Sequence, residues 1–288
     1  MPQFQRDHEL KISDLRARDH PAFKVHRYLP RDGWLIEFGS VDHAYNPLAY
    51  PQLLAEFAQQ PFAENEGLKF VVRWGLPSFA GGDDDGGPPR VGDETARVAE
   101  STVKGHAESI ERLMRMLEYR QGADEAGLRS YLQSLAGASA PGRATIRFMS
   151  GREESAYELS LGQGSLITQV EGLVRKAVNE NVSGPPGLSF VVEEPLRLNP
   201  VATNLMQAIY WHLVVLTSHP EDPAAPKPIG RCQSESCGKM FVRTHGHQNF
   251  CAPPPDSSGS ESLCAARSRK AKQRKAMRET EGLDGPGR

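Results

Sequence analysis

Four cysteines near the C-terminal end of the sequence are the residues best suited to chemistry. They are the only cysteines among 288 residues and stand at Cys232, Cys237, Cys251 and Cys264. Zinc prefers thiolate or imidazole ligands, and a structural zinc site takes four of them in a tetrahedron. The first residues lack the apolar stretch of a secretory signal, so we expect a reducing, cytoplasmic environment, where clustered cysteines are more often metal ligands than disulfides. The pattern therefore predicts a Zn²⁺ site.

The spacing of the cysteines indicates how such a site would close. Cys232 and Cys237 are separated by four residues, and Gly238 relieves the turn after the second thiol. The other pair, Cys251 and Cys264, is separated by a longer Pro/Ser-rich segment that we expect to bulge out as a loop. A module this small cannot bury a sufficient core, so the metal would have to supply folding free energy.

Two alternatives to four thiolates stay open at this point. His245 and His247 lie between the second and third cysteines and offer a different fourth ligand, which would give a Cys₃His site and leave Cys264 as a free thiol. The other alternative is a cysteine cluster that holds no metal.

The segment after Cys264 is strongly basic, although the whole chain has a formal net charge of −2. It contains no acidic residue between Arg267 and Arg278. A basic segment that follows a metal ligand predicts a helix that contacts a polyanion, and the absence of interleaved aromatic residues favours the phosphates of duplex DNA over single strands. A solvated terminus is the alternative. The candidate nucleic-acid-binding residues are Arg267, Arg269, Lys270, Lys272, Arg274, Lys275 and Arg278.

The cysteine window resembles the CGNR-type zinc fingers of bacterial proteins, which are treble-clef-like. Cys232 and Cys237 match the first cysteine pair of that family, the CGKMF segment its knuckle and hairpin, and Cys251 its third ligand. The run Cys264-Ala-Ala-Arg267 stands where the family has Cys-Gly-Asn-Arg, so the cysteine and the arginine match and the two residues between them differ. The resemblance implies zinc binding, nucleic-acid binding and a role as a transcriptional regulator, and it covers the C-terminal module alone.

The rest of the chain predicts an α+β body that would carry a small C-terminal treble-clef-like zinc finger and a basic helix. We expect the body over 1–218, a Pro-rich linker over 219–230, the zinc-finger module with its basic helix over 231–278 and a disordered tail over 279–288. Residues 1–30 are polar and broken by prolines, and no element is expected there.

Hydrophobic periodicity and turn residues predict the elements of the body. A stop at Gly122, an N-cap at Asp93 and a helix opened by Asn199-Pro200 are part of this prediction, and residues 81–89 are expected to form a loop. The predicted strands cover 34–38, 68–74, 144–149, 157–161 and 188–193, with a short hairpin strand at 240–242; the predicted helices cover 50–59, 93–121, 127–135, 165–179 and 199–217.

Other polar residues of the body have simple structural interpretations. His106 and His212 fall on apolar helix faces, where a lone histidine is usually a hydrogen-bonded core residue. Asp42-His43 stands in an expected turn, and the acidic run 83–85 in an expected solvated loop. The three tryptophans, at positions 34, 74 and 211, are expected in the core.

The sequence thus favours a zinc-binding, nucleic-acid-binding protein, with two alternatives. One is a protein-interaction module in which the zinc is purely structural and the partner is a protein. The other is an enzyme whose site lies in the body, although no nucleophile elbow, Walker loop or dinucleotide fingerprint is present. No apolar run is long enough to predict a membrane partner.

Overall fold

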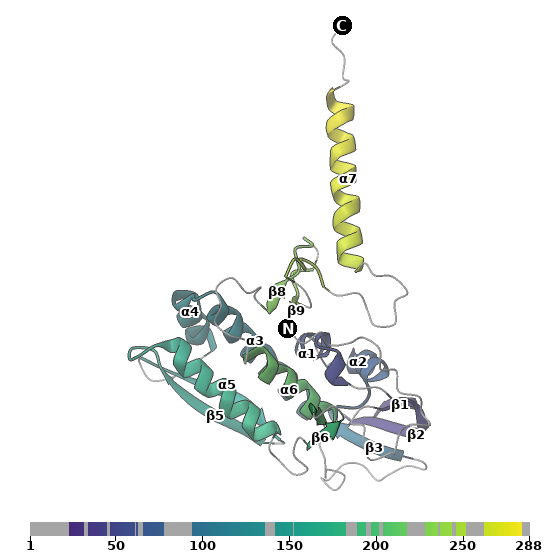
Figure 1. Ribbon diagram of the computed structural model, residues 1–288, viewed down its shortest axis with the longest axis vertical. Coiled ribbons are helices and arrows are strands. Elements are labelled where there is room, and N and C mark those ends of the chain that lie inside the picture. The colour runs from purple at the N-terminus through teal and green to yellow at the C-terminus, as the bar shows by residue number, and fades with distance from the viewer. Residues whose placement is uncertain are drawn as a thin grey trace. The chain divides into compact units, whose positions relative to one another are not determined.

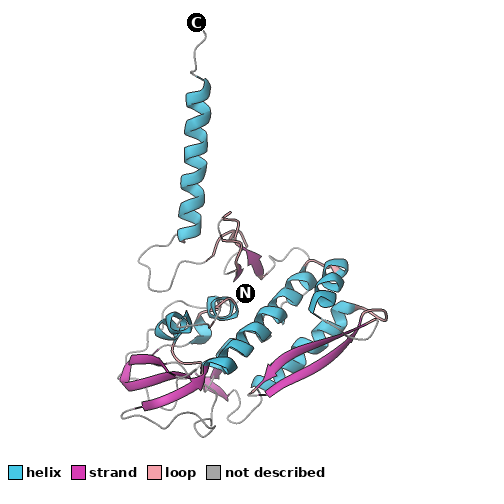
Figure 2. Cartoon of the chain, turned by 180° about the vertical axis from the view of Figure 1, so that it is seen from behind, coloured by secondary structure: helices cyan, strands magenta, loops and turns pink. Residues whose placement is uncertain are grey.

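A computed structural model describes most elements of the chain, which divides into two compact units, Met1–Pro220 and Glu221–Arg288. Both units combine helices with small antiparallel sheets, so the described residues form an α+β structure (Figures 1 and 2). The described residues are 23–31, 34–44, 47–60, 62, 66–77, 94–135, 142–151, 153–182, 189–193, 197–201, 204–217, 228–235, 237–243, 246–251 and 262–283.

The described residues of the N-terminal unit form three antiparallel sheets. The first has the order β1-β2-β3, formed by Phe23–Arg31, Trp34–Ala44 and Glu94–Ala99. The others are two-stranded: β4 (Arg143–Ser150) pairs with β5 (Glu153–Ser160), and β6 (Ser189–Glu193) pairs with β7 (Arg197–Val201). Each pairing is local in sequence except that of β2 with β3, so the strands form separate hairpin-like layers rather than one continuous sheet.

Helices supply most of the core of this unit. They are the 3₁₀ helix η2 (Pro47–Ala49), α1 (Gln52–Ala58), α2 (Glu66–Trp74), α3 (Glu100–Gln121), α4 (Glu125–Leu135), α5 (Leu166–Val182) and α6 (Leu205–Thr217). Helix α3 contacts α1, α4, α5 and β4, which makes it the central element (Figure 1). Its buried face includes Val103, Ala107, Ile110, Leu113 and Leu117, at the spacings of three and four that the sequence predicts.

Several sequence predictions for this unit are confirmed. Helices form within the predicted segments around α1, α4 and α5, and strands form where β4, β5 and β6 were expected. The chain leaves α3 at Gly122, as expected. His106 and His212 are both buried core residues, and Trp74 is buried. Trp211 is only partly buried, against Leu48 and Ala208.

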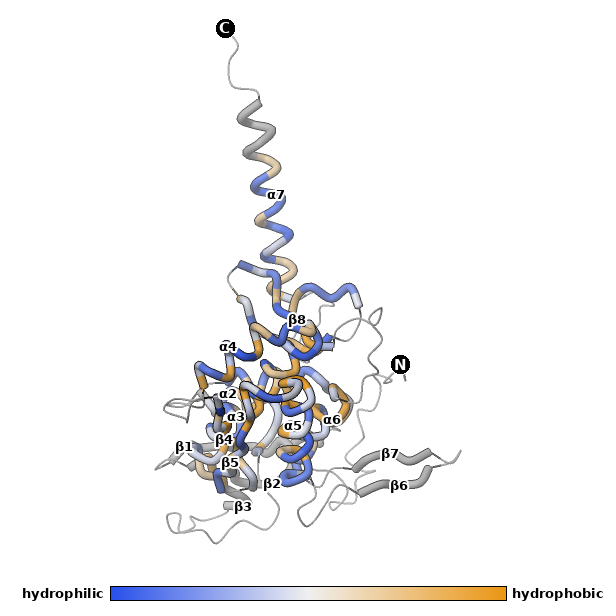
Figure 3. The backbone as a smooth tube through the Cα atoms, turned by 90° about the vertical axis from the view of Figure 1, so that its left-hand side faces the viewer, coloured by the Kyte–Doolittle hydropathy of each residue, from blue (hydrophilic) through white to orange (hydrophobic). Residues whose placement is uncertain are grey.

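The predicted strand at 68–74 is wrong, because this segment forms helix α2. Phe70, Val71 and Trp74 are buried, whereas Val72 is 56% exposed. Burial of two consecutive residues and of a third one turn later is the pattern of a helix; a strand would bury alternate residues. Figure 3 shows hydrophilic and apolar residues alternating along the described helices of the N-terminal unit.

Two predicted helix starts are also wrong. The segment expected to begin a helix at Asp93 first forms strand β3, which pairs Ala99 with Trp34, and the helix begins only at Glu100. The segment Asn199-Pro200 lies in strand β7, where Pro200 is paired with Phe190. In both cases pairing with another strand overrides a local helix-start signal.

Helix α6 begins six residues after the predicted N-cap. Asn204 is its cap, because its Oδ1 accepts a hydrogen bond of 2.9 Å from the Gln207 backbone amide. The predicted apolar stripe is confirmed: Leu205, Ile209, Leu213 and Leu216 are all buried.

The sequence also missed strand β1 and misplaced Asp42-His43. Pro30 lies in β1 opposite Leu35, and β1 is the edge strand of its sheet, where a residue without an amide hydrogen is tolerated. Asp42 and His43 lie in strand β2, with His43 opposite Lys24, rather than in a turn. The predicted loop at 81–89 and most of the predicted linker at 219–230 lie outside the described residues.

The C-terminal unit contains a small hairpin of β8 (Ile229–Arg231) and β9 (Met240–Val242), followed by the long helix α7 (Leu263–Leu283). Ile229, Met240, Phe241 and Val242 are buried. Across the described part of the chain, no helix combines the length and the apolar character needed to cross a membrane.

Candidate metal centre

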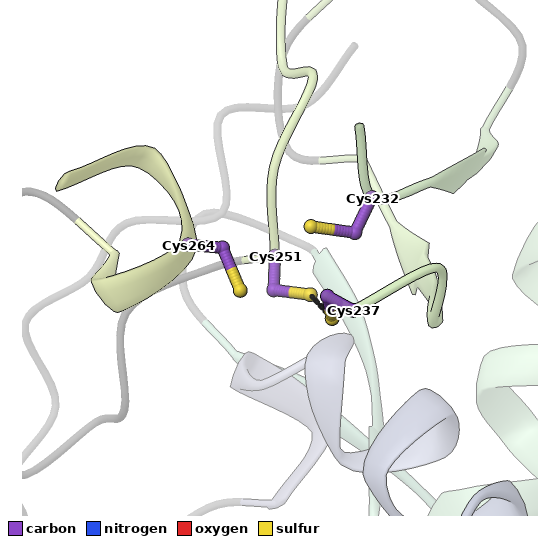
Figure 4. Close-up of side chains that lie close together, drawn as sticks. All are labelled: Cys232, Cys237, Cys251 and Cys264. Atoms are coloured by element: carbon purple, nitrogen blue, oxygen red, sulfur yellow. Dashed lines mark hydrogen bonds between the residues drawn. The ribbon is translucent and has the colours of Figure 1, made fainter. Parts of the chain in front are cut away.

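Three segments of the C-terminal unit contribute the four cysteines (Figure 4). Cys232 follows strand β8 directly, and Cys237 lies in the connection from β8 to β9. Cys251 follows the segment after β9, and Cys264 stands in the first turn of α7. The predicted strand at 240–242 is confirmed as β9, so the hairpin that presents the first pair has the expected place in the sequence.

Backbone hydrogen bonds hold the first two cysteines in a tight turn. The Cys232 amide donates to the Lys239 carbonyl and the Cys237 amide to the Ser234 carbonyl, both at 2.9 Å. Gly238 follows with a φ of +59°, a conformation that side-chain-bearing residues rarely adopt. The Gln233 amide donates to the Asn249 carbonyl at 2.9 Å, which ties the segment before Cys251 to the same turn.

The four thiol sulfurs converge. All four Sγ atoms lie within 4.8 Å of one another, and the Sγ atoms of Cys237 and Cys251 are 3.6 Å apart (Figure 4). A tetrahedral zinc site with Zn–S bonds of about 2.3 Å needs sulfurs about 3.8 Å apart. The arrangement therefore fits a metal ion bound by four thiolates, and the four cysteines predicted as ligands are brought together.

The pKa values of the cysteines indicate that a bound cation would stabilise the cluster. Burial, together with the neighbouring thiols of Cys237 and Cys232, raises the pKa of Cys264 to about 11. The same causes raise the pKa of Cys251 further. Burial opposes ionisation of Cys232 as well, but hydrogen bonds from the Cys251 and Ser234 amides lower its pKa. One thiolate is thus favoured and its neighbours resist adding a second negative charge, which a bound dication would reverse.

The first turn of α7 fixes the position of Cys264. Ser262, immediately before the helix, is buried and caps it: its Oγ accepts from the Ala265 amide at 3.1 Å and its carbonyl from the Ala266 amide at 3.0 Å. Ser262 is not among the residues predicted from the sequence, although a serine just before a helical segment is the usual signal for an N-cap. A thiolate at this end of a helix is favoured by the helix dipole.

Histidine is not part of the cluster that the described residues form. The group of potential ligands consists of the four cysteines, and the described histidine of this region, His247, is exposed. His245 lies outside the described residues. The geometry therefore favours four thiolates over the Cys₃His alternative.

The basic residues predicted to contact nucleic acid lie on α7 beyond the metal centre. All side chains from Arg269 to Met277 are exposed, as is Arg267. Arg278 lies in the same helix, and its side chain is outside the described part. Figure 3 shows hydrophilic residues alternating with weakly apolar ones along the coloured part of α7. The cations are therefore accessible to a partner along this helix.

The titratable groups of the N-terminal core are engaged with one another. His106 Nε2 is 2.6 Å from the Gly151 carbonyl and so must donate to it, which leaves Nδ1 to accept from the Tyr210 hydroxyl at 2.8 Å. His212 Nε2 donates to the Pro47 carbonyl at 3.1 Å. Burial lowers the pKa of each histidine to about 4, although the bond to the carbonyl opposes the shift. Both are neutral structural residues at pH 7.

No protein-family model, no curated protein and no solved structure matches this chain. What can be said of its function therefore rests on the geometry of the cysteine cluster and on the charge of α7.

Proposed function

We propose that the C-terminal unit binds one Zn²⁺ through Cys232, Cys237, Cys251 and Cys264 and uses helix α7 to bind nucleic acid. The observation that carries the proposal is the convergence of the four cysteine sulfurs to within 4.8 Å of one another. The chain has no other cysteine, so its thiols are concentrated at this one position. Soft thiolate sets of this kind suit zinc, and magnesium or calcium would prefer oxygen ligands.

The zinc site of this proposal is structural. Four protein ligands fill the tetrahedron and leave no position for a catalytic water. A bound Zn²⁺ would supply the folding free energy that the few buried apolar side chains of β8 and β9 cannot. Its second consequence is positional: the ligand in the first turn of α7 ties the start of the basic helix to the hairpin, which reduces the entropy lost when the helix docks.

Charge complementarity supports nucleic acid as the partner. From Leu263 to Arg278 the sequence of α7 carries seven cations and no acid. Such a helix would gain affinity by replacing the counterions of a phosphate backbone. The CGNR-type fingers that the cysteine window resembles suggest the same role, which would make the protein a bacterial transcriptional regulator.

Two measurements on the full-length protein test this proposal. Elemental analysis of the purified protein should give one zinc per chain. Binding to random-sequence duplex DNA should weaken with salt, with a slope of log K against log[salt] of about −3.6 if four cations reach phosphates. Absence of metal would reject the zinc site. Metal without any salt-dependent duplex binding would reject nucleic acid and favour a zinc module that docks on a protein.

A further inference from the structure

The cations of α7 surround the helix instead of lining one face. Successive residues of an α-helix are rotated by about 100° around its axis, so Arg267, Lys270 and Arg274 project within about 60° of one another. The other cations are spread around the remaining circumference, in the order Lys275, Lys272 and Arg269. A helix that rests on a flat anionic surface needs cations on one side only. A helix with cations on opposite sides suits a partner that presents phosphates on both flanks.

One arc of the helix differs from the rest. Between Arg269 and Lys270, which are about 100° apart around the axis, lies the widest arc of α7 without a cation. This arc holds Ala266, Gln273 and Met277, of which Gln273 and Met277 are exposed. Met277 is 61% exposed, an unusual state for a large apolar side chain on a helix of this charge. We call Ala266, Gln273 and Met277 the uncharged strip.

The chemistry of the uncharged strip matches the edges of base pairs. A glutamine amide can form two hydrogen bonds with adenine N6 and N7, and an apolar side chain can contact the thymine methyl group. Gln273 and Met277 are four residues apart, about 6 Å along the axis. This distance spans about two base pairs at 3.4 Å each.

We propose that α7 enters the major groove of B-form duplex DNA with the uncharged strip toward the bases and the cations toward the phosphates on both sides. Gln273 and Met277 would then be specificity-determining residues, and the flanking Arg269, Lys270 and Arg274 would position the helix. A helix about 10–12 Å across fits a groove about 12 Å wide. A-form RNA is a poor partner, because its major groove is too narrow to admit side chains.

This inference rests on the proposed function, since it requires that α7 bind a duplex at all. It adds sequence preference, which phosphate contacts alone do not give. Preference and affinity can be measured separately, so failure of one can be distinguished from failure of the other.

The experiment is selection of duplexes from a randomised 20-bp DNA library by the full-length, metal-loaded protein, compared with Gln273→Ala/Met277→Ala. We expect the wild type to enrich a short motif that contains an adenine and a nearby thymine, by about tenfold or more over random sequence. The double variant should lose this enrichment while it binds random duplex with an unchanged salt slope, because no cation is removed. Ser268→Ala, on the far side of the helix and equally uncharged, is the matched control and should keep the enriched motif.

Three outcomes would overturn the inference. If the wild type binds duplexes in a salt-dependent manner without enriching any motif, the proposed function stands and base reading is wrong. If the double variant keeps the wild-type motif, the residues that read bases lie elsewhere. If A-form duplex RNA binds as tightly as DNA, α7 does not enter the groove. Failure to bind any duplex rejects the nucleic-acid part of the proposed function itself.

Discussion

The two units of this chain reach a folded state by different physical means. The N-terminal unit buries long apolar side chains from several helices, among them Trp74, Ile110 and Leu113, each at most 2% exposed. Among the described residues of the C-terminal unit, the buried apolar side chains are those of a short hairpin, together with Cys232. Hydrophobic burial can hold the first unit together, and the second needs another source of free energy.

Polar groups show the same contrast. In the N-terminal unit the buried histidines find complementary partners, as His106 does in Tyr210 and the Gly151 carbonyl. In the C-terminal unit four thiols converge, and burial, together with the neighbouring thiols of Cys237 and Cys232, raises the pKa of Cys264 to about 11. A core histidine is satisfied by the protein itself, whereas the thiol cluster would be stabilised by a bound cation. Metal dependence should therefore be confined to one unit.

The largest effect should come from removing the metal or a ligand. We expect Cys232→Ser or Cys237→Ser to release zinc and unfold the C-terminal unit, because structural zinc contributes about 10–16 kcal/mol of apparent binding free energy in small modules. The N-terminal unit should keep its melting transition, which differential scanning calorimetry with and without a chelator can follow. A protein that holds no metal and contains a Cys232–Cys237 disulfide would contradict the idea that a metal stabilises the C-terminal unit.

The choice of fourth ligand sharpens the description of the C-terminal unit. Cys264→Ser should lower zinc affinity more than about 100-fold, beyond the 10–100-fold cost of losing an outer-shell partner. The matched control is the double variant His245→Ala/His247→Ala, which should change affinity little. Competition with a chromophoric chelator measures both. The reverse order would indicate a Cys₃His site and a free thiol at Cys264.

The N-terminal unit should respond to a cavity in its core and not to metal. Leu113 is 1% exposed in the central helix α3, so Leu113→Ala should reduce the free energy of unfolding of this unit by about 2–5 kcal/mol. Urea denaturation followed by tryptophan fluorescence measures the loss, since Trp74 belongs to this unit. The zinc content should stay at the wild-type value. A variant that loses both stability and metal would show that the units do not fold independently.

The two units also differ in how well the sequence predicted them. The cysteine cluster could be predicted because ligand type and clustering are readable without knowing the fold. The two wrong helix starts in the N-terminal unit come from strand pairing: β3 forms because Glu94–Ala99 pairs with the distant strand β2, and β7 forms because Arg197–Val201 pairs with the neighbouring strand β6. The apolar run of α2 has no clear helical or strand periodicity in the sequence. In the structure this segment is a helix, and its Phe70 packs against Phe57 and Phe62. Local sequence signals are sufficient to predict a ligand cluster, but they fail to predict secondary structure where pairing with another strand determines it.

Acid should weaken the N-terminal unit through its buried histidines. Each has a pKa lowered to about 4 in the folded state against 6.5 unfolded. Between these values the unfolded chain binds more protons, so stability falls as the pH falls through this window. Between pH 7 and pH 5 each histidine should cost about 2 kcal/mol. Urea denaturation at several pH values measures this, and His212→Gln, which cannot titrate, should flatten the dependence. A wild type equally stable at pH 7 and pH 5 would mean that the two rings are accessible to protons.

The smallest effect concerns the cations of α7, which contribute to binding and little to folding. Lys270 and Arg274 are exposed, so replacing both by alanine should leave zinc content and both melting transitions unchanged. If each contacts a phosphate, the double variant should bind all duplex sequences more weakly and reduce the salt slope by about 1.8, because each contact contributes about 0.9. Fluorescence anisotropy with a labelled random duplex at several salt concentrations measures the slope.

Lys239→Ala is the matched control, since it removes an exposed cation from the hairpin instead of the helix. If Lys270→Ala/Arg274→Ala binds as tightly as the wild type at low salt, α7 does not contact phosphates. The N-terminal unit would then be a core stabilised by apolar burial, and the C-terminal unit a metal-stabilised module that docks on a protein.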